Sequence, residues 1–338
     1  MGLSLSSLGL GTYLGPEDAA TDAGYEVAVA VALARGANVF DSAINYRGQR
    51  SERAIGRALA SAFAEGRARR DEIFVSTKGG FLPHDADDPR PARRYVSETF
   101  VASGLVGPEE IALGCHCLAP AYLKDQVSRS RENLGLETID LYHLHNVETQ
   151  LGAVDRAGFR RRLRDAVATL EEEIACGRVG AWGLATWEGL RVPREHPEHV
   201  SLEEMLAIAR EVAGGAHHFR AVQLPTSFAM AQALVYRSQE AASIRRPALE
   251  AAAELGLAAF GSASIMQGRL AMVDFPEEVA EAFPGTSTSA EQALQFARSA
   301  PGLTTALVGA SSAEHAEEDF GLSAIPPADP ARLMGLFV

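Results

Sequence analysis

Short apolar runs alternate with longer amphipathic stretches along this chain, and glycine or proline usually marks the change. The runs that predict strands are 8–12, 38–40, 73–77, 139–144, 179–185, 221–224, 257–260 and 304–308. Apolar positions at helical spacing follow them at 22–34, 51–64, 121–134, 159–175, 202–212, 247–255, 289–300 and 313–320. Eight strand–helix units predict a (β/α)8 TIM barrel that forms a single domain over residues 1–338.

An open, doubly wound sheet is the alternative that the same alternation allows. Such a sheet would carry a glycine-rich fingerprint after its first strand. The run Gly9-Leu10-Gly11-Thr12-Tyr13-Leu14 has a leucine where the third glycine belongs. The barrel is therefore favoured.

The connection after the third predicted strand is unusually long, because it runs over residues 79–118. We expect it to be an insertion or a functional loop over one face of the barrel. With the loops near Trp187, Phe228 and Met230 it would build the substrate pocket. A contact in a homo-oligomer is an equal alternative for this segment.

Composition narrows the classes of partner. The net charge of −13 argues against nucleic acid or an anionic membrane. No apolar stretch is long enough to span a membrane, and the N-terminus lacks the basic region of a secretory signal. Only three cysteines occur, so we expect a reducing, cytoplasmic setting without disulfides. We expect no metal, since Cys115-His116-Cys117 has no second ligand pair nearby.

The second, third and fourth predicted strands each end in a polar residue: Asp41, Lys78 and His145. Tyr46 follows five residues after Asp41. Taken singly, such an aspartate usually caps a helix and such a lysine is usually solvated. A parallel barrel presents its strand ends on one face, so we expect these four side chains to meet there.

Together the four residues form a proton-transfer set. A phenol holds its proton too tightly to be an efficient acid near neutrality, but a neighbouring ammonium lowers its pKa. Lys78 can supply that charge to Tyr46, and Asp41 can hold Lys78 as an ion pair. His145 can orient or polarise a substrate oxygen. Such a site protonates an oxygen while hydride reaches the adjacent carbon, and hydride requires a nicotinamide cofactor.

Several blocks carry a family resemblance: Phe40-Asp41-Ser42-Ala43, Tyr46, Ser51-Glu52, Ser76-Thr77-Lys78, Asn133-Leu134-Gly135, Ile139-Asp140-Leu141-Tyr142, Leu144-His145, Gly180-Ala181-Trp182-Gly183-Leu184, Val222-Gln223, Gln267-Gly268-Arg269-Leu270 and Val308-Gly309-Ala310-Ser311-Ser312. In their order and spacing the chain resembles the aldo-keto reductases over nearly its whole length. The resemblance implies that Asp41, Tyr46, Lys78 and His145 are the catalytic residues. Tyr46 would be the general acid, with NADPH giving hydride to an aldehyde or ketone.

The resemblance also implies contacts to the nicotinamide. Thr186 and Gln223 would hold its amide, although Ala185-Thr186 replaces the usual Ser-Asn pair. Ser262 stands where a tyrosine usually stacks on the ring, so Phe260, Trp187 or Phe228 would have to replace it. The other candidate cofactor contacts on this side are Gly11, Thr12, Asp41, Gln267 and Arg269.

At the phosphate end, Gly309, Ser311 and Ser312 precede a predicted helix whose free N–H groups suit an anion. Ser312 is alternatively a plain N-cap. His315 and Asp319 stand where the family commonly has a basic residue and an asparagine. The missing arginine or lysine weakens the case for a 2′-phosphate. From the resemblance we still expect NADP as the cofactor, with NAD as the alternative.

We expect an NAD(P)H-dependent oxidoreductase that reduces a small-molecule carbonyl to an alcohol. A protein of the same fold that binds the cofactor as a regulatory subunit, with little turnover, is the alternative. The altered nicotinamide contacts keep that alternative open, and the complete set of four polar residues argues against it. The sequence names no substrate.

Overall fold

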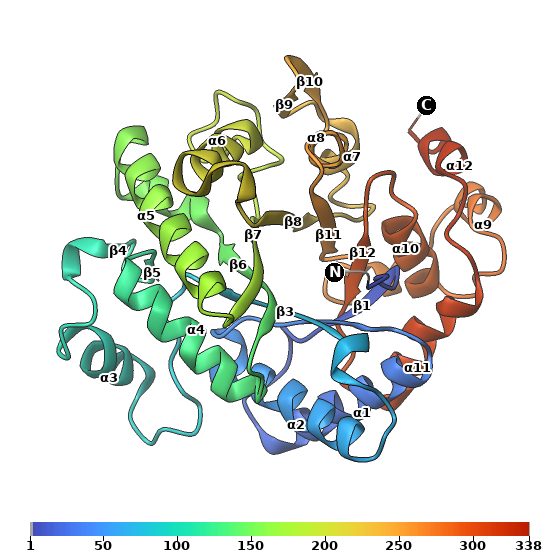
Figure 1. Ribbon diagram of the computed structural model, residues 1–338. Coiled ribbons are helices and arrows are strands. Elements are labelled where there is room, and N and C mark those ends of the chain that lie inside the picture. Colours follow the sequence, from blue (N-terminus) through green and yellow to red (C-terminus); the bar gives the residue numbers. More distant parts are fainter. Residues whose placement is uncertain (1–2, 338) are drawn as a thin grey trace.

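Eight parallel strands close into a barrel in the computed structural model, which describes residues 3–337 (Figure 1). The strands are β1 (Leu8–Gly11), β2 (Val39–Asp41), β3 (Phe74–Gly79), β6 (Ile139–His145), β7 (Val179–Ala185), β8 (Phe219–Pro225), β11 (Ala258–Ser262) and β12 (Thr305–Val308). Their order is β1-β12-β11-β8-β7-β6-β3-β2, and β1 pairs with both β2 and β12. The predicted (β/α)8 barrel is confirmed, and the open sheet is excluded.

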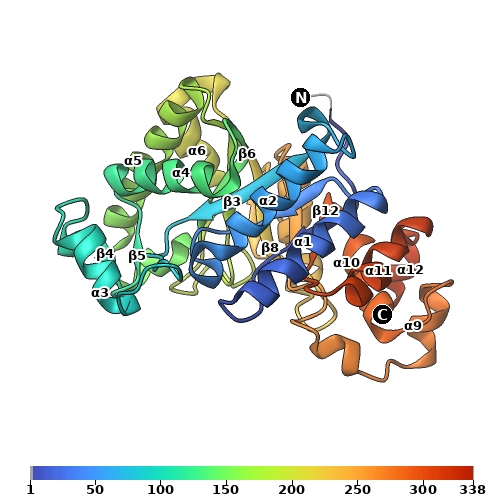
Figure 2. The same cartoon turned by 90° about the horizontal axis from the view of Figure 1, so that it is seen from below.

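Helices surround the barrel in both views (Figures 1 and 2). Those that follow barrel strands are α1 (Ala19–Ala34), α2 (Arg50–Ala64), α4 (Pro120–Leu134), α5 (Arg156–Ala175), α6 (Leu202–Ala213), α8 (Ala248–Glu254), α10 (Ser289–Arg298) and α11 (Ala313–Gly321). Shorter helices are α3 (Ala92–Val96), α7 (Gln232–Val235), α9 (Glu277–Ala282) and α12 (Pro330–Gly335). Within residues 3–337, none has the length and apolarity that a membrane crossing requires.

Two helices begin three residues earlier than their apolar spacing predicts, because an aspartate caps each one. The side chain of Asp18 accepts a hydrogen bond from the backbone N–H of Thr21 at the start of α1. Asp155 accepts from Gly158 at the start of α5. These caps satisfy N–H groups that have no partner within the helix, so polar residues join the first turn.

The apolar core has two parts. A small cluster fills the barrel interior and consists of Val39, Leu141, Ala221, Phe260 and Leu307. A much larger cluster joins the outer faces of the strands to the helices. This division follows from strand geometry, because alternate side chains point to opposite sides of a strand.

The same alternation sends the polar strand-end residues inward. Leu141 lies in the interior cluster, so His143 and His145 on the same strand also face the interior. Lys78 pairs with His143, and Asp41 pairs with Ser76 two residues before Lys78. Paired residues of neighbouring strands point to the same side, so Asp41, Lys78 and His145 all project into the barrel.

The connection between β3 and α4 forms a small unit beside the barrel (Figures 1 and 2). It contains α3 and an antiparallel hairpin of β4 (Ile111–Ala112) and β5 (His116–Cys117). The ring of Phe100 packs edge-on against Tyr122 of α4, with centroids 5.6 Å apart. Phe100 thus packs this unit against α4. Its assignment as an insertion stays a prediction. A second hairpin, β9 (Gln239–Ala241) with β10 (Ile244–Arg246), lies between α7 and α8.

Candidate active site

A cavity of about 420 Å³ lies at the carboxyl ends of the barrel strands. Its lining includes ten predicted site residues: Gly11, Thr12, Asp41, Tyr46, His145, Thr186, Gln223, Ser262, Gln267 and Gly309. Of the other predicted residues, Lys78 is buried beside Asp41. Five more are not among its lining residues: Arg269, Ser311, Ser312, His315 and Asp319.

Lys78 and Asp41 form a buried ion pair in the floor of the cavity. The Nζ of Lys78 donates to Oδ2 of Asp41 at 2.6 Å and to the carbonyl oxygen of Ser42 at 2.6 Å. The other carboxylate oxygen of Asp41 accepts from Ser76 Oγ at 2.6 Å and from Gln223 Nε2 at 2.9 Å. The lysine side chain is only 1% exposed. Because both charges are paired and bonded, the pair is fixed before any ligand arrives.

Tyr46 lies over this pair, with Nζ of Lys78 4.8 Å from the centroid of its ring. Burial is the largest influence and raises the pKa of Tyr46, while the Lys78 ammonium lowers it. The net pKa stays above the ordinary value, so burial outweighs the lowering by Lys78 that the sequence predicts. Burial also opposes the ammonium of Lys78, but Asp41 and Tyr46 raise the pKa of Lys78 overall. Tyr46 therefore keeps its proton near neutrality.

His145 meets the tyrosine edge-on, with ring centroids 5.9 Å apart. Burial and, after it, the charge of Lys78 hold the pKa of His145 well below its ordinary value. Its imidazole is therefore neutral at physiological pH. A neutral ring beside Tyr46 can hydrogen-bond to a substrate oxygen, but it does not contribute a positive charge.

His116 explains the Cys-His-Cys run in structural terms. Its Nε2 lies 2.6 Å from the carbonyl oxygen of His145, and Gln150 Nε2 lies 2.6 Å from its Nδ1. Both ring nitrogens therefore have partners, which leaves neither free for a metal. Burial lowers the pKa of His116 to about 4, so the ring is neutral. The residue instead supports the backbone of His145.

Residues from three of the sequence blocks that carry the family resemblance are hydrogen-bonded to one another behind the site. Glu52 is fully buried in α2, and its carboxylate accepts from Thr77 Oγ1 at 2.6 Å and Asn133 Nδ2 at 2.8 Å. Ser51 Oγ donates to the carbonyl oxygen of Thr12 at 2.6 Å. These residues join β1, β3, α2 and α4, so their role is to fix the strands that carry the polar set.

The opposite side of the cavity has polar groups with fewer partners. Thr186 is buried, and its Oγ1 has no hydrogen-bond partner in the described part of the chain. The Gln223 side chain reaches Asp41 through its nitrogen. By contrast, the hydroxyl of Thr12 contacts Ser42 Oγ at 3.0 Å and the Asp41 carbonyl at 3.3 Å. Thr186 therefore has the clearest unused hydrogen-bonding capacity among the predicted cofactor contacts.

Among the three aromatic residues considered for stacking near Ser262, only Trp187 lines the cavity. Phe260 stacks on Phe74 inside the barrel, with centroids 5.9 Å apart. Phe228 stacks on Phe296 at 4.0 Å, within another aromatic cluster. The ring of Phe228 is partly buried and packs against the apolar core, and the expectation that its loop helps to build the substrate pocket stays a prediction.

The predicted phosphate end contains no cationic side chain between Arg298 and Arg332. Ser312 caps α11, because its hydroxyl accepts from the backbone N–H of His315 at 3.2 Å. Burial, together with Glu318 and Glu291, raises the pKa of Asp319 to about 7. Arg269, one of the candidate cofactor contacts, is exposed in the loop after β11. An adenosine 2′-phosphate would thus find backbone and hydroxyl donors here.

Several cavity residues escape sequence reasoning. Tyr13, Asn45, Phe81 and Asn146 all line it, yet they sit in loops. For Asn45, the one signal in the sequence is its position directly before Tyr46. Glu148 is buried behind the β7 loop, where its Oε1 accepts from the backbone N–H groups of residues 187–189. Burial raises the pKa of this carboxyl.

The barrel thus carries a buried lysine–aspartate pair beneath a tyrosine at its strand ends. Residues 7–199 match the model of the aldo/keto reductase family. The chain belongs to this family of oxidoreductases. The comparison with curated proteins found no match.

Solved structures share the fold at low sequence identity. An aldo/keto reductase from Klebsiella pneumoniae, solved with NADP and acetate, is 18% identical, with 98% of this chain and 90% of that chain covered and a TM-score of 0.64. A holo aldo-keto reductase from Bacillus halodurans is 20% identical, with coverages of 98% and 92% and a TM-score of 0.64. Glycerol dehydrogenase from Gluconobacter oxydans is 18% identical, with coverages of 99% and 91% and a TM-score of 0.65.

Proposed function

We propose that this protein reduces an aldehyde or ketone to an alcohol with NADPH, or with NADH, as the hydride donor. One observation carries the proposal: the tyrosine over the Asp41–Lys78 pair shares one cavity with His145 and with the hydroxyl of Thr186, which has no hydrogen-bond partner within residues 3–337. This geometry provides a proton donor, a neutral hydrogen-bonding group and a contact for a cofactor. The family and the fold support the same reaction class.

Tyr46 is the proposed general acid. Its phenol carries a proton at neutral pH because burial raises its pKa. The ammonium of Lys78 stabilises the phenolate that forms when the proton moves to the substrate oxygen. Asp41 keeps the lysine in place, and His145 orients the oxygen through a hydrogen bond. Asn45 and Tyr13 border the same space and would contact the substrate.

The chain fits a nicotinamide dinucleotide at the end where the amide would lie. Thr186 Oγ1 is a buried donor and acceptor without a partner within residues 3–337, and such a group is costly unless a ligand completes it. A bound NAD(P)H supplies hydride to the carbonyl carbon. The chain's own contribution is to hold the amide through Thr186 and Gln223, and to line the dinucleotide with Gly11, Ser262, Gln267 and Gly309.

The proposed test compares two tyrosines whose ring centroids lie 5.0 Å apart, Tyr13 and Tyr46. Tyr46→Phe should lower kcat by about 10³-fold, as the loss of a general acid does, and leave dinucleotide affinity within about threefold. Tyr13→Phe is the comparison, because it removes a hydroxyl from the neighbouring ring without removing the proposed acid, and its kcat should fall far less than that of Tyr46→Phe. Steady-state kinetics with an aldehyde and ketone panel, together with NADPH and NADH fluorescence titrations, measure both quantities.

Wild-type turnover in Tyr46→Phe would exclude this mechanism. Tight dinucleotide binding by the wild-type protein with no turnover on any carbonyl would instead favour a cofactor-binding regulatory subunit. Ser262 lines the cavity at the position where the family resemblance implies an aromatic residue, and this altered nicotinamide contact keeps the second function in the test.

A further inference from the structure

Arg47 directly follows the proposed acid and is almost completely buried, with a side chain only 1% exposed. It does not line the cavity. Its backbone lies in the left-handed region, with φ of 50°, and the next two residues, Gly48 and Gln49, have φ of 55° and 72°. Non-glycine residues adopt this region only when surrounding contacts compensate for the strain. Those contacts come from the guanidinium.

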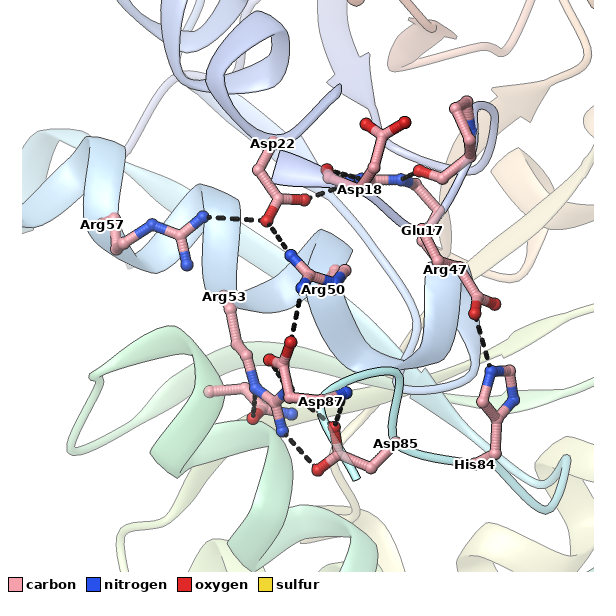
Figure 3. A network of polar contacts seen from close by, with 12 residues as sticks. Glu17, Asp18, Asp22, Arg47, Arg50, Arg53, Arg57, His84, Asp85 and Asp87 are labelled. Atoms are coloured by element: carbon pink, nitrogen blue, oxygen red, sulfur yellow. Dashed lines mark hydrogen bonds and ion pairs between the residues drawn. The ribbon is translucent and has the colours of Figure 1, made fainter. Parts of the chain in front are cut away.

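The guanidinium of Arg47 binds one loop at three points (Figure 3). Nε donates to the carbonyl oxygen of Pro16 at 2.9 Å, and Nη2 donates to that of Asp18 at 3.2 Å. Nη2 also pairs with Asp22 Oδ1 at 2.7 Å. The planar fork of arginine suits such divergent acceptors. The three acceptors belong to the β1–α1 loop and the first turn of α1.

That loop forms one wall of the cavity. Tyr13 and Leu14 line the cavity, and the Tyr13 ring meets Tyr46 edge-on with centroids 5.0 Å apart. Tyr25 donates its hydroxyl to the carbonyl oxygen of Leu14 at 2.7 Å, and Arg47 lies 5.4 Å from the centroid of its ring. Arg47 thus connects the backbone next to the acid with the wall that faces the acid.

Neighbouring arginines make pairs that are more open to solvent. Arg50 shares Asp22 with Arg47, with its Nη1 2.6 Å from Oδ2, but the Arg50 side chain is 19% exposed (Figure 3). Arg50 and Arg53 of α2 also pair with Asp87, whose side chain is 51% exposed, and Arg53 pairs with Asp85 at 2.7 Å. Exposed ion pairs contribute little, because water screens them. The side chain of Arg47 is the most buried of the four arginines in this network, so its contacts should have the largest effect on the site. The other three are Arg50, Arg53 and Arg57.

We propose that Arg47 is a positioning residue for the reduction: it fixes the loop of residues 13–18 against the Tyr46 turn, so that the two tyrosines present one rigid surface to the substrate. The proposal rests on the function proposed for Tyr46. Small displacements of a positioned acid can cost about 10²-fold in rate.

Three variants test it. Arg47→Ala removes every contact, and Arg47→Lys keeps a charge beside Asp22 without the fork that reaches Pro16 and Asp18. Arg57→Ala is the matched control, because Arg57 is 50% exposed and contacts the same Asp22 carboxylate at 3.4 Å. We expect kcat to fall about 100-fold in Arg47→Ala and about tenfold in Arg47→Lys. Dinucleotide Kd should stay within about threefold, and Arg57→Ala should behave as wild type.

Hydrogen exchange gives a readout independent of turnover. Amides of residues 13–22 should exchange faster in Arg47→Lys than in wild type, whereas amides of α4 should not change. If the wild-type protein turns over no carbonyl, the proposed function fails, while exchange still tests the clamp on the loop.

Three results would overturn the proposal. The first is kcat within threefold of wild type in Arg47→Lys and, where it folds, in Arg47→Ala. The second is a parallel loss of kcat and dinucleotide affinity, which would indicate a general structural role. The third is unchanged exchange of residues 13–22 in Arg47→Lys.

Discussion

The two ends of the cavity are built differently. Around Asp41 and Lys78, each charged group is bonded to another part of the chain, and the contacts are short. Along the side that would take the dinucleotide, Thr186 Oγ1 lacks a partner among the described residues, as does Nδ1 of His145 across the cavity. The ion pair is thus complete by itself, whereas the polar groups around it have capacity left for a ligand.

This difference teaches how the parts of a catalytic site are stabilised. A proton donor has to be oriented before the substrate arrives, so its supporting charges are buried and bonded within the protein. A cofactor contact can remain unsatisfied until the ligand completes it, at some cost to the free protein. Substitutions at the first end should therefore change rate, and those at the second should change affinity or stability.

The largest expected effect is that of Lys78→Met. Without the ammonium, the pKa of Tyr46 rises further, because burial is no longer opposed. We expect kcat to fall about 10³-fold and the basic limb of the pH–rate profile to move to higher pH. Dinucleotide affinity should change little. Steady-state kinetics over a range of pH, with fluorescence titration, measures all three.

Ser76→Ala is the control for Lys78→Met, because it removes one bond to the same Asp41 carboxylate and keeps both charges. An unchanged pH profile in Lys78→Met, with the fold intact by thermal unfolding, would contradict the coupling between lysine and tyrosine. It would also remove the contrast between the two ends of the cavity.

A smaller effect is expected at Asp319, which lies in α11 at the predicted phosphate end. Burial raises its folded pKa to about 7 from 3.8, so between these values the folded protein binds a proton that the unfolded chain has released. Stability from this group therefore falls as pH rises toward 7. As pH rises from 5 to 8, the free energy of unfolding of Asp319→Asn should increase by about 2–3 kcal/mol relative to that of wild type. Urea unfolding at each pH measures this difference.

Glu314→Gln is the comparison for Asp319→Asn, since Glu314 is exposed on the same helix and should show no such gain. A constant difference between Asp319→Asn and wild type across this pH range would show that Asp319 titrates normally.

The smallest effect is expected at Thr186. Thr186→Ala removes a hydroxyl that is free to bind the ligand, so dinucleotide Kd should rise about fivefold, the value of one neutral hydrogen bond. Ser264→Ala is the control, because Ser264 lines the same cavity but donates to the Gly261 carbonyl at 3.3 Å. Equal affinities for wild type and Thr186→Ala would mean that the hydroxyl is not a cofactor contact.

Residues that follow the period of a strand could be predicted, and residues that depend on loop geometry could not. Asp41, Lys78 and His145 end apolar runs, and strand alternation alone sends them to one side. Tyr13 and Asn146 reach the cavity through turns whose shape depends on distant contacts, such as those of Arg47. No local pattern records these contacts.

Some roles also differ from what residue type indicates. Glu52 and Asn133 belong to blocks that carry the family resemblance, but they are structural partners: the buried Glu52 carboxylate accepts from the half-buried Asn133 amide. His116 sits between two cysteines, as a metal ligand would, but both of its nitrogens are occupied by Gln150 and the His145 carbonyl. For Tyr46, the sequence correctly indicates Lys78 as the neighbour. Whether burial or the Lys78 charge dominates the pKa of Tyr46 can be judged only from the folded structure.

The inward projection of Asp41, Lys78 and His145 has a consequence for how this chain can change. Because side chains alternate, deleting or inserting one residue within β2, β3 or β6 would turn the polar residue at its end toward the helices. Loops beyond the strand ends carry no such restriction. Length changes in the loops after β7 and β11 should therefore leave these three residues in place, provided that the proposed dinucleotide contacts Thr186, Ser262 and Gln267 are kept.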